Sequence, residues 1–283
     1  DCTIAETELE VTVGGADLDN NSQLVFSHPG ITATPKTTPA GEFDGGPQRV
    51  GNVYAVKIDG AVPAGIYDAR VTGDFGLSNP RRFAVGLHEE IKDSGSNHSQ
   101  ADAQEITVGL TINGVADANN RDYFKFTVTA GQRILLRIDG ESLDSRIDAT
   151  LMLYDANNNE LANNRESVGL DPMIDHTFTD AGVYTVAVHD FVYRGGGEYQ
   201  YRLTVDTAPY VDFVFPPVGT LGSTSEYTLF GRNLAGGEPA EGMLVNGAQL
   251  QKLSAQIAIP TADQLTTQLS LRRFPSAVWD HSF

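Results

Sequence analysis

The sequence predicts an all-β fold of three β-sandwich modules in tandem, and three observations support this. Apolar and polar residues alternate in many short segments, which is the pattern of half-buried antiparallel strands. Clusters rich in Gly, Asn and Asp separate these segments, as in "VGGADLDNNS" and "RGGGE". The chain has 283 residues, which is too long for one typical domain and fits two or three.

The individual strands follow from this alternation. In the first third, "ELEVTV" places Leu9, Val11 and Val13 on one face of a strand. The segment "NVYAVKID" does the same with Tyr54 and Val56. In the middle of the chain the strand segments are "DYFKFTV", "RILLRID", "VYTVAV" and "YQYRLTV". Short strands joined by Gly- and Asn-rich turns indicate sandwiches or barrels.

Two stretches mark the expected module boundaries. The polar, pattern-free stretch 85–105 is expected to be a linker that enters the middle module. The stretch 206–219 contains Pro209, Pro216 and Pro217, which stiffen a connection and break strand continuity. The predicted modules are therefore, in order, 1–87, 88–207 and 208–283.

The first and third modules share an approximate repeat. "TELEVTVGGADLD" near the start resembles "TSEYTLFGRNLAG" near the end, with Thr12 matching Thr228 and Leu18 matching Leu234. Two copies of one module are therefore expected to flank a middle module of different pattern.

The charge of the chain excludes several classes of partner. The net charge is −18 and the pI is near 4.5, which argues against nucleic acid, because phosphate binding needs clustered Lys and Arg. The same charge disfavours anionic membrane surfaces, and no apolar run approaches the ~20 residues of a membrane span. The acidic balance is compatible with divalent cations.

The single cysteine and the chain ends suggest an excised piece. Cys2 has no second cysteine to pair with, so an internal disulfide is impossible. The chain begins with Asp and carries no signal peptide. We expect it to be part of a longer polypeptide.

The middle module resembles the bacterial pre-peptidase C-terminal domain. The similarity is carried, in order, by "RDYFKFTVTAGQRILLRI", "SRIDATLMLYDANNNELANN" and "DAGVYTVAVHDFVYRGGGEYQYRLTV". The resemblance implies a jelly-roll β-sandwich that serves as a non-catalytic appendage of secreted bacterial proteins.

The flanking modules resemble immunoglobulin-like TIG modules of large secreted bacterial proteins. The first module opens with "VTVGGADL" and closes with "VPAGIYDARVTGDFGLSNPRRFAVG", in which Tyr67, Ala69 and Val71 share one strand face. The third module lacks this closing pattern, so it is either truncated at Phe283 or closed differently.

Motifs for catalysis are absent from the sequence. There is no HExxH, no G-x-S-x-G and no Walker loop, and the six histidines show no pair at zinc-ligand spacing. Carboxylate pairs for glycoside hydrolysis are conceivable in an acidic chain, but nothing marks one pair out. The chain is therefore predicted not to be an enzyme, and an enzyme with an unrecognised carboxylate site ranks last.

Calcium is the one cofactor that the sequence suggests. In "YDANNNELANNRES", the residues Asp155, Asn157 and Asn159 have the spacing of an EF-hand loop, but Glu160 stands where that loop needs Gly. An Asn-rich hairpin turn is the favoured interpretation.

The family resemblance points to a calcium site upstream, where the entry linker meets an early Asp-rich loop. By that resemblance, the candidate ligands are Glu89, Glu90, Asn97, Asp117 and Asp122. The Glu-Pro-Asn core of the family linker is missing here, and a solvated acidic linker is the alternative.

Aromatic residues near the end of the middle module suggest a ligand surface. Phe191, Tyr193, Tyr199 and Tyr201 could grip a sugar or an extended polypeptide. At strand spacing, however, Tyr199 and Tyr201 with Leu203 are more typical of core.

These observations lead to two main functional hypotheses. The first is a structural spacer, adhesion or accessory segment of a secreted, periplasmic or cell-surface bacterial protein, whose partners are other domains of the same polypeptide. The second is a calcium-dependent module that binds an extracellular polymer, either collagen-like or polysaccharide.

Overall fold

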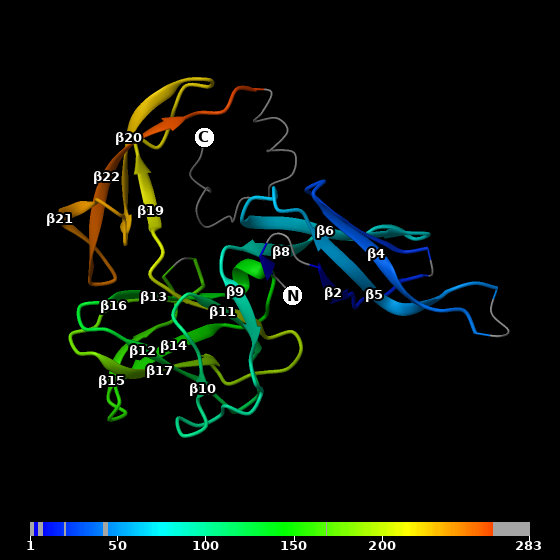
Figure 1. Cartoon of the computed structure of the whole chain (residues 1–283), viewed down its shortest axis with the longest axis horizontal. Coiled ribbons are helices and arrows are strands. Elements are labelled where there is room, and N and C mark those ends of the chain that lie inside the picture. The colour runs from blue at the N-terminus through cyan, green and yellow to red at the C-terminus, as the bar shows by residue number, and fades with distance from the viewer. Residues whose placement is uncertain (1–2, 5–7, 20, 42–44, 168, 263–283) are drawn as a thin grey trace. The chain divides into compact units, whose positions relative to one another are not determined.

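The computed structural model describes the chain except for residues 1–2, 5–7, 20, 42–44, 168 and 263–283 (Figure 1). It confirms the all-β class, because the described elements are strands apart from one 3-10 turn at Glu141–Leu143. Within this described part, no helix has the length and apolar character to cross a membrane. The chain divides into two compact units, Asp1–Glu90 and Ile91–Phe283.

The N-terminal unit is built from two sheets. One sheet has the order β1 (Thr3–Ile4), β8 (Arg81–Gly86), β6 (Gly65–Gly73) and β3 (Gln23–Phe26), with β7 (Gly76–Leu77) paired to β6. The other has the order β2 (Glu8–Thr12), β5 (Gln48–Ile58) and β4 (Ile31–Thr38). The segments expected around Leu9 and Tyr54 are therefore neighbouring antiparallel strands, with Leu9 opposite Val56.

The core of this unit follows the predicted alternation along β5. Tyr54 and Val56 are fully buried, and they pack with Phe83 and Val85 of β8. The Tyr54 hydroxyl donates to the Ser22 carbonyl at 3.0 Å, so this buried phenol is hydrogen-bonded.

The middle module is a sandwich of two five-stranded sheets. The first sheet has the order β10 (Gln104–Glu105), β12 (Asp122–Val128), β17 (Gly182–Asp190), β14 (Ala149–Tyr154) and β15 (Glu160–Asn164). The second has the order β16 (Met173–Thr177), β13 (Arg133–Asp139), β18 (Gln200–Asp206), β11 (Leu110–Val115) and β9 (Glu89–Lys92). Their facing side chains form one core, which includes Phe124, Phe126, Leu136 and Leu203.

The expected entry linker contains structure that the sequence pattern did not predict. Within 85–105, β9 joins the edge of the second sheet and β10 pairs in parallel with β12 of the first. An edge strand is held by backbone hydrogen bonds, which need no apolar alternation. The linker therefore forms an edge of each sheet, and the polar loop 93–103 lies between these two strands.

The residues after 207 form a single described sheet, here called the C-terminal sheet. Its order is β19 (Tyr210–Phe215), β20 (Thr224–Arg232), β22 (Ala248–Ala258) and β21 (Glu238–Val245). The prolines of 206–219 bracket β19 and do not interrupt it, because Pro209 precedes the strand and Pro216 follows it. The predicted truncation at Phe283 lies outside the described residues.

Candidate functional site

Asp122 is a buried carboxylate at the first position of β12. Its relative exposure is 1%, and its Oδ2 accepts a hydrogen bond from the Tyr201 hydroxyl at 2.8 Å. Tyr201 comes from β18 of the opposite sheet and is itself buried. This hydrogen bond therefore joins the two sheets of the sandwich.

The loop that follows β9 is fastened to β12 through Asn97. This side chain is fully buried and its Nδ2 donates to the Tyr123 carbonyl at 3.0 Å. The Tyr123 amide donates in return to the Asn97 carbonyl at 2.8 Å, and Ser94 Oγ donates to Asn97 Oδ1 at 3.2 Å. These bonds bring the linker alongside Asp122.

His98 lies between two carboxylates at this place. Its Nε2 is 3.5 Å from Asp117 Oδ2, and its Nδ1 is 3.4 Å from Asp122 Oδ1. The second approach lacks hydrogen-bond geometry, because His98 Nδ1 and Asp122 Oδ1 are both buried without a hydrogen-bond partner. Asp93 Oδ1 is also buried and unpartnered. We call Asp93, Asn97, His98, Asp117, Asp122 and Tyr201 the Asp122 cluster.

The electrostatics of the cluster favour protonated acids. Burial raises the pKa of Asp122 to about 6, against the lowering effect of the Tyr201 hydrogen bond, and the nearby negative charge of Asp93 adds to the rise. Burial also raises the pKa of Asp93. Burial and the charge of Asp122 hold the pKa of Tyr201 well above its usual value, so Tyr201 remains a hydrogen-bond donor. Asp122 and Asp93 therefore bind a proton more readily than ordinary aspartates do.

The structure brings together three of the five predicted calcium ligands. Asn97, Asp117 and Asp122 meet in the Asp122 cluster. Glu89 and Glu90 lie at the start of β9, and Asp93 is the linker acid that belongs to the cluster. In the part of the chain that the structure describes, no three Asp, Glu, His or Cys side chains are arranged to hold a metal ion.

Sequence reasoning missed Asp93 and His98. The available signal was their position in the same linker as Asn97, at four residues before it and one after it. The Asp93 amide donates to the Asn113 carbonyl at 2.9 Å, which anchors Asp93 beside β11. This long-range contact has no signature in the local pattern of the linker.

The Asp155 loop is a hairpin turn between β14 and β15, as the sequence favoured. Asp155 Oδ1 accepts from the amides of Asn157 and Asn159, both at 2.8 Å, and Asn159 Nδ2 donates to Oδ2 at 2.8 Å. Asn158 takes the left-handed conformation with φ of 65°. The Asn159 side-chain hydrogen bond lowers the pKa of Asp155. The carboxylate therefore organises its own turn.

The four predicted aromatic residues separate into surface and core, starting with Phe191 at the surface. Phe191 begins the loop 191–199 between β17 and β18, and it is 48% exposed. The Arg165 guanidinium lies 3.7 Å from the centre of its ring. Asp148 holds Arg165 with two hydrogen bonds, at 2.9 and 2.7 Å, so the ring has a fixed support on one side.

Tyr193 is held in the same loop by two other side chains. Its ring stacks on His189, with centroids 4.5 Å apart and an interplanar angle of 7°. Its hydroxyl accepts from Arg121 Nε at 3.0 Å and from Nη2 at 2.6 Å. Tyr199 is half-buried against the core and Tyr201 lies within it. The aromatic surface of this loop therefore consists of Phe191 and Tyr193.

One known protein family matches part of the middle module. The model of the bacterial pre-peptidase C-terminal domain matches residues 120–190. No curated protein matches the chain.

Three solved structures illustrate the structural similarity. The pre-peptidase C-terminal domain of a Bacillus anthracis collagenase has 22% identity and a TM-score of 0.30, covering 36% of this chain and 93% of its own. The Aeromonas hydrophila periplasmic inhibitor of g-type lysozyme has 17% identity and a TM-score of 0.28, covering 36% and 96%. A Bacteroides ovatus protein of a mixed-linkage glucan utilization locus, SGBP-B, solved with a mixed-linkage heptasaccharide, has 10% identity and a TM-score of 0.23, covering 72% of both chains.

Proposed function

We propose that the chain is a non-catalytic structural and interaction segment of a secreted or cell-surface bacterial protein, acting as a spacer, adhesion or accessory module. The match over residues 120–190 supports the bacterial accessory-domain interpretation. The observation that carries the interaction role is the supported aromatic surface of the loop 191–199.

This loop has the properties of a contact surface for an extracellular polymer. Phe191 and Val192 are 48% and 58% exposed and adjacent, which gives an apolar patch. Two side chains of this loop are held in place, since Arg165 supports Phe191 of the patch and Arg121 supports the neighbouring Tyr193. A patch whose side chains are already ordered loses less conformational entropy on binding. We propose that it contacts an insoluble polymer, either collagen-like or polysaccharide.

Co-sedimentation with fibrillar collagen and with an insoluble polysaccharide tests this surface. The expected result is that the protein sediments with one of the two polymers and that Phe191→Ala weakens this about tenfold, which corresponds to about 1.4 kcal/mol. Val183→Ala is the matched control, because Val183 is equally exposed and lies at the start of β17, at the opposite end of the strand from Phe191. Equal binding by the two variants, or sedimentation with neither polymer, would contradict the proposal.

A second candidate function is calcium-dependent binding, and the unpartnered oxygens of the Asp122 cluster favour it. Asp93 Oδ1 and Asp122 Oδ1 are buried without hydrogen-bond partners, and calcium is coordinated by such carboxylate oxygens. Asn97 and Asp117 would add further oxygens, and His98 would have to leave the space between Asp117 and Asp122. Glu89 and Glu90 remain predicted ligands from the linker side.

A calcium titration followed by thermal unfolding tests the second candidate. The melting temperature should rise with calcium as RT ln(1 + [L]/Kd) requires, and magnesium at equal ionic strength should have a smaller effect. Asp122→Asn should abolish the shift, and Glu198→Gln, which alters an exposed ion pair, should retain it. The absence of a shift in millimolar calcium would sink this candidate and leave the aromatic surface untouched.

A further inference from the structure

The outward face of the second sheet of the middle module is buried where β13 and β16 run side by side. Leu135 and Met173 point away from the sandwich core, yet their exposures are 0% and 4%. Asp175 is the register partner of Leu135, and its side chain is only 6% exposed. In a free-standing sandwich, this face would be solvated. A neighbouring part of the chain must therefore cover it.

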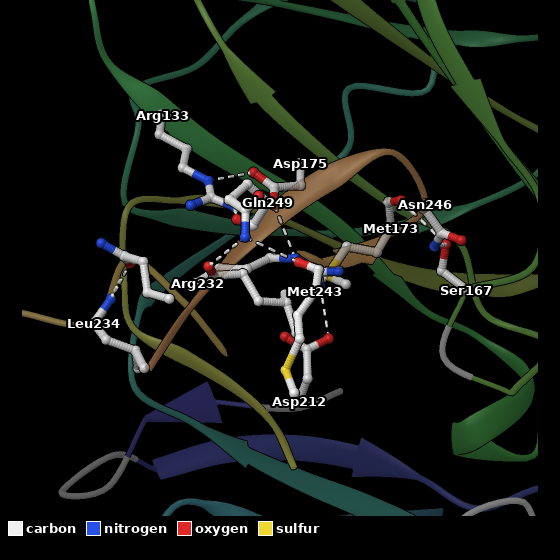
Figure 2. A network of polar contacts seen from close by, with 12 residues as sticks. Arg133, Ser167, Met173, Asp175, Asp212, Arg232, Leu234, Met243, Asn246 and Gln249 are labelled. Atoms are coloured by element: carbon white, nitrogen blue, oxygen red, sulfur yellow. Dashed lines mark hydrogen bonds and ion pairs between the residues drawn. The ribbon is translucent and has the colours of Figure 1, made fainter. Parts of the chain in front are cut away.

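The C-terminal sheet contributes Arg232 to this face. Arg232 ends β20, its side chain is 1% exposed, and its Nε lies 2.8 Å from Asp175 Oδ2 (Figure 2). This is an ion pair without an aligned hydrogen bond, because the Arg232 Nε has no hydrogen-bond partner. Arg232 Nη1 is 3.1 Å from Asp212 Oδ1 of β19 and 3.5 Å from Met173 Sδ. One guanidinium thus contacts both the middle module and its own sheet.

Arg133 makes the reciprocal connection from the middle module. It holds Asp175 through Nε and Nη2 at 2.7 and 2.5 Å, and its Nη2 also donates to the Gln249 carbonyl of β22 at 2.9 Å. Nearby, Asn246 Nδ2 donates to Ser167 Oγ at 2.6 Å (Figure 2). The middle module and the C-terminal sheet therefore each contribute an arginine that contacts the other.

The charges at this place balance. We call Arg133, Asp175, Asp212 and Arg232 the ionic joint, which holds two positive and two negative side chains. The Tyr210 ring lies beside the joint, 5.9 Å from the Arg232 guanidinium, and it is also 5.5 Å from the guanidinium of Arg137. Buried charges in such a neutral arrangement add little net stability, but they tolerate only one geometry.

We propose that the ionic joint fixes the orientation of the C-terminal sheet on the middle module, so that residues 91–262 act as one rigid element. An apolar contact alone would let the two sheets slide, because hydrophobic attraction has no direction. A guanidinium shared between Asp175 and Asp212 loses its partners on any such shift. The ionic joint therefore holds the C-terminal sheet in one orientation relative to the middle module. This role does not depend on what the loop 191–199 binds.

Distance measurements between spin labels test this proposal on the full chain. Cys2 is replaced by Ser, and labels are attached at Ala156→Cys in the β14–β15 turn and at Gln256→Cys in β22, both of which are exposed positions. The parent should show one narrow distance distribution. Arg232→Met, which keeps the apolar stem and removes the charge, should broaden it at least twofold. Arg146→Met, which breaks the exposed Arg146–Glu198 pair, should leave it narrow.

Two results would overturn the proposal: a broad distribution in the parent, or a distribution in Arg232→Met as narrow as in the parent. Should Arg232→Met fail to fold, Arg133→Gln provides the same test more mildly. Arg133 is 21% exposed and its loss leaves the Asp175–Arg232 pair in place. The expected result is a broadening smaller than that of Arg232→Met, and no broadening with Arg133→Gln would count against the joint.

Discussion

A single residue, Asp122, sets most of the chemistry of the candidate site. Its carboxylate is shielded from water, accepts one hydrogen bond from Tyr201, and lies near the acid Asp93. Burial favours the neutral carboxylic acid, while a bound cation would favour the carboxylate. Under the calcium proposal, protons and calcium would compete for this group.

The raised pKa of Asp122 predicts a specific dependence of stability on pH in metal-free protein. Its pKa is about 6 when folded and 3.8 as the ordinary value, so the folded state binds the proton more tightly. Protonation of Asp122 therefore stabilises the folded state. This contribution to the free energy of unfolding, up to about 3 kcal/mol, is complete below about pH 4 and is lost as the pH rises through 6. Urea unfolding at a series of pH values measures this effect. The free energy of unfolding should fall more steeply with rising pH in the wild type than in Asp122→Asn, and parallel pH profiles would refute the prediction.

At this scale the sequence predicted some members of the cluster and not others. Asp117 and Asp122 flank a strand start, and Asn97 lies in the entry linker, so a family pattern could find them. Burial of Asp93 depends on how the linker folds back along β11, which is a long-range property. The same holds for His98, whose partners Asp117 and Asp122 lie beyond the linker in the sequence.

At the scale of elements, Gly195 locks two loops of the middle module together. A Cβ at this position would lie 2.2 Å from the Ala118 nitrogen and 2.5 Å from the Ala116 carbonyl oxygen. These are backbone atoms that cannot rotate away. The neighbouring Gly196 amide donates to the same Ala116 carbonyl at 2.9 Å. The close approach therefore positions the loop that carries Phe191 and Tyr193.

Gly195→Ala is expected to lower the free energy of unfolding by about 1–3 kcal/mol, because the added methyl group forces the two loops apart. Gly197→Ala is the matched control in the same loop, since nothing lies within 4 Å of its added Cβ. Chemical denaturation of both variants measures the difference. Equal stability of the two variants would show that the loops separate freely.

Elements with strong alternation were predictable, and those held by other forces were not. The segments "DYFKFTV" and "RILLRID" became β12 and β13 because one face of each must be apolar. In β18, every residue from Tyr201 to Asp206 is buried, although the alternation suggested one buried face. The strand β9 has no such pattern, and β19 was obscured by its flanking prolines. Burial of outer faces depends on neighbours that local sequence does not name.

At the scale of the whole molecule, the net charge of −18 dominates the electrostatics. Self-repulsion of this size opposes the compact state and is screened by salt. The melting temperature should therefore rise when sodium chloride is added to a low-salt buffer, as scanning calorimetry can measure. A fall in melting temperature would mean that exposed ion pairs outweigh the repulsion. This salt series also gives the baseline for any effect of calcium.

The all-β class could be predicted from the sequence, but the ionic joint could not. Arg232 and Asp175 lie on different strands in different modules, and neither stands in a motif. Charged residues on a predicted strand are normally assigned to the solvent face. Their burial results from the packing of one sheet on another.

The covered outward face of β13 and β16 also decides how the chain can be divided for laboratory work. A fragment that stopped at residue 207 would expose Met173 to solvent and leave Asp175 with Arg133 alone. Newly exposed apolar surface of this kind promotes aggregation. Such a fragment should be less soluble than one that extends through residue 262, so the family match over 120–190 is a poor guide to expression boundaries.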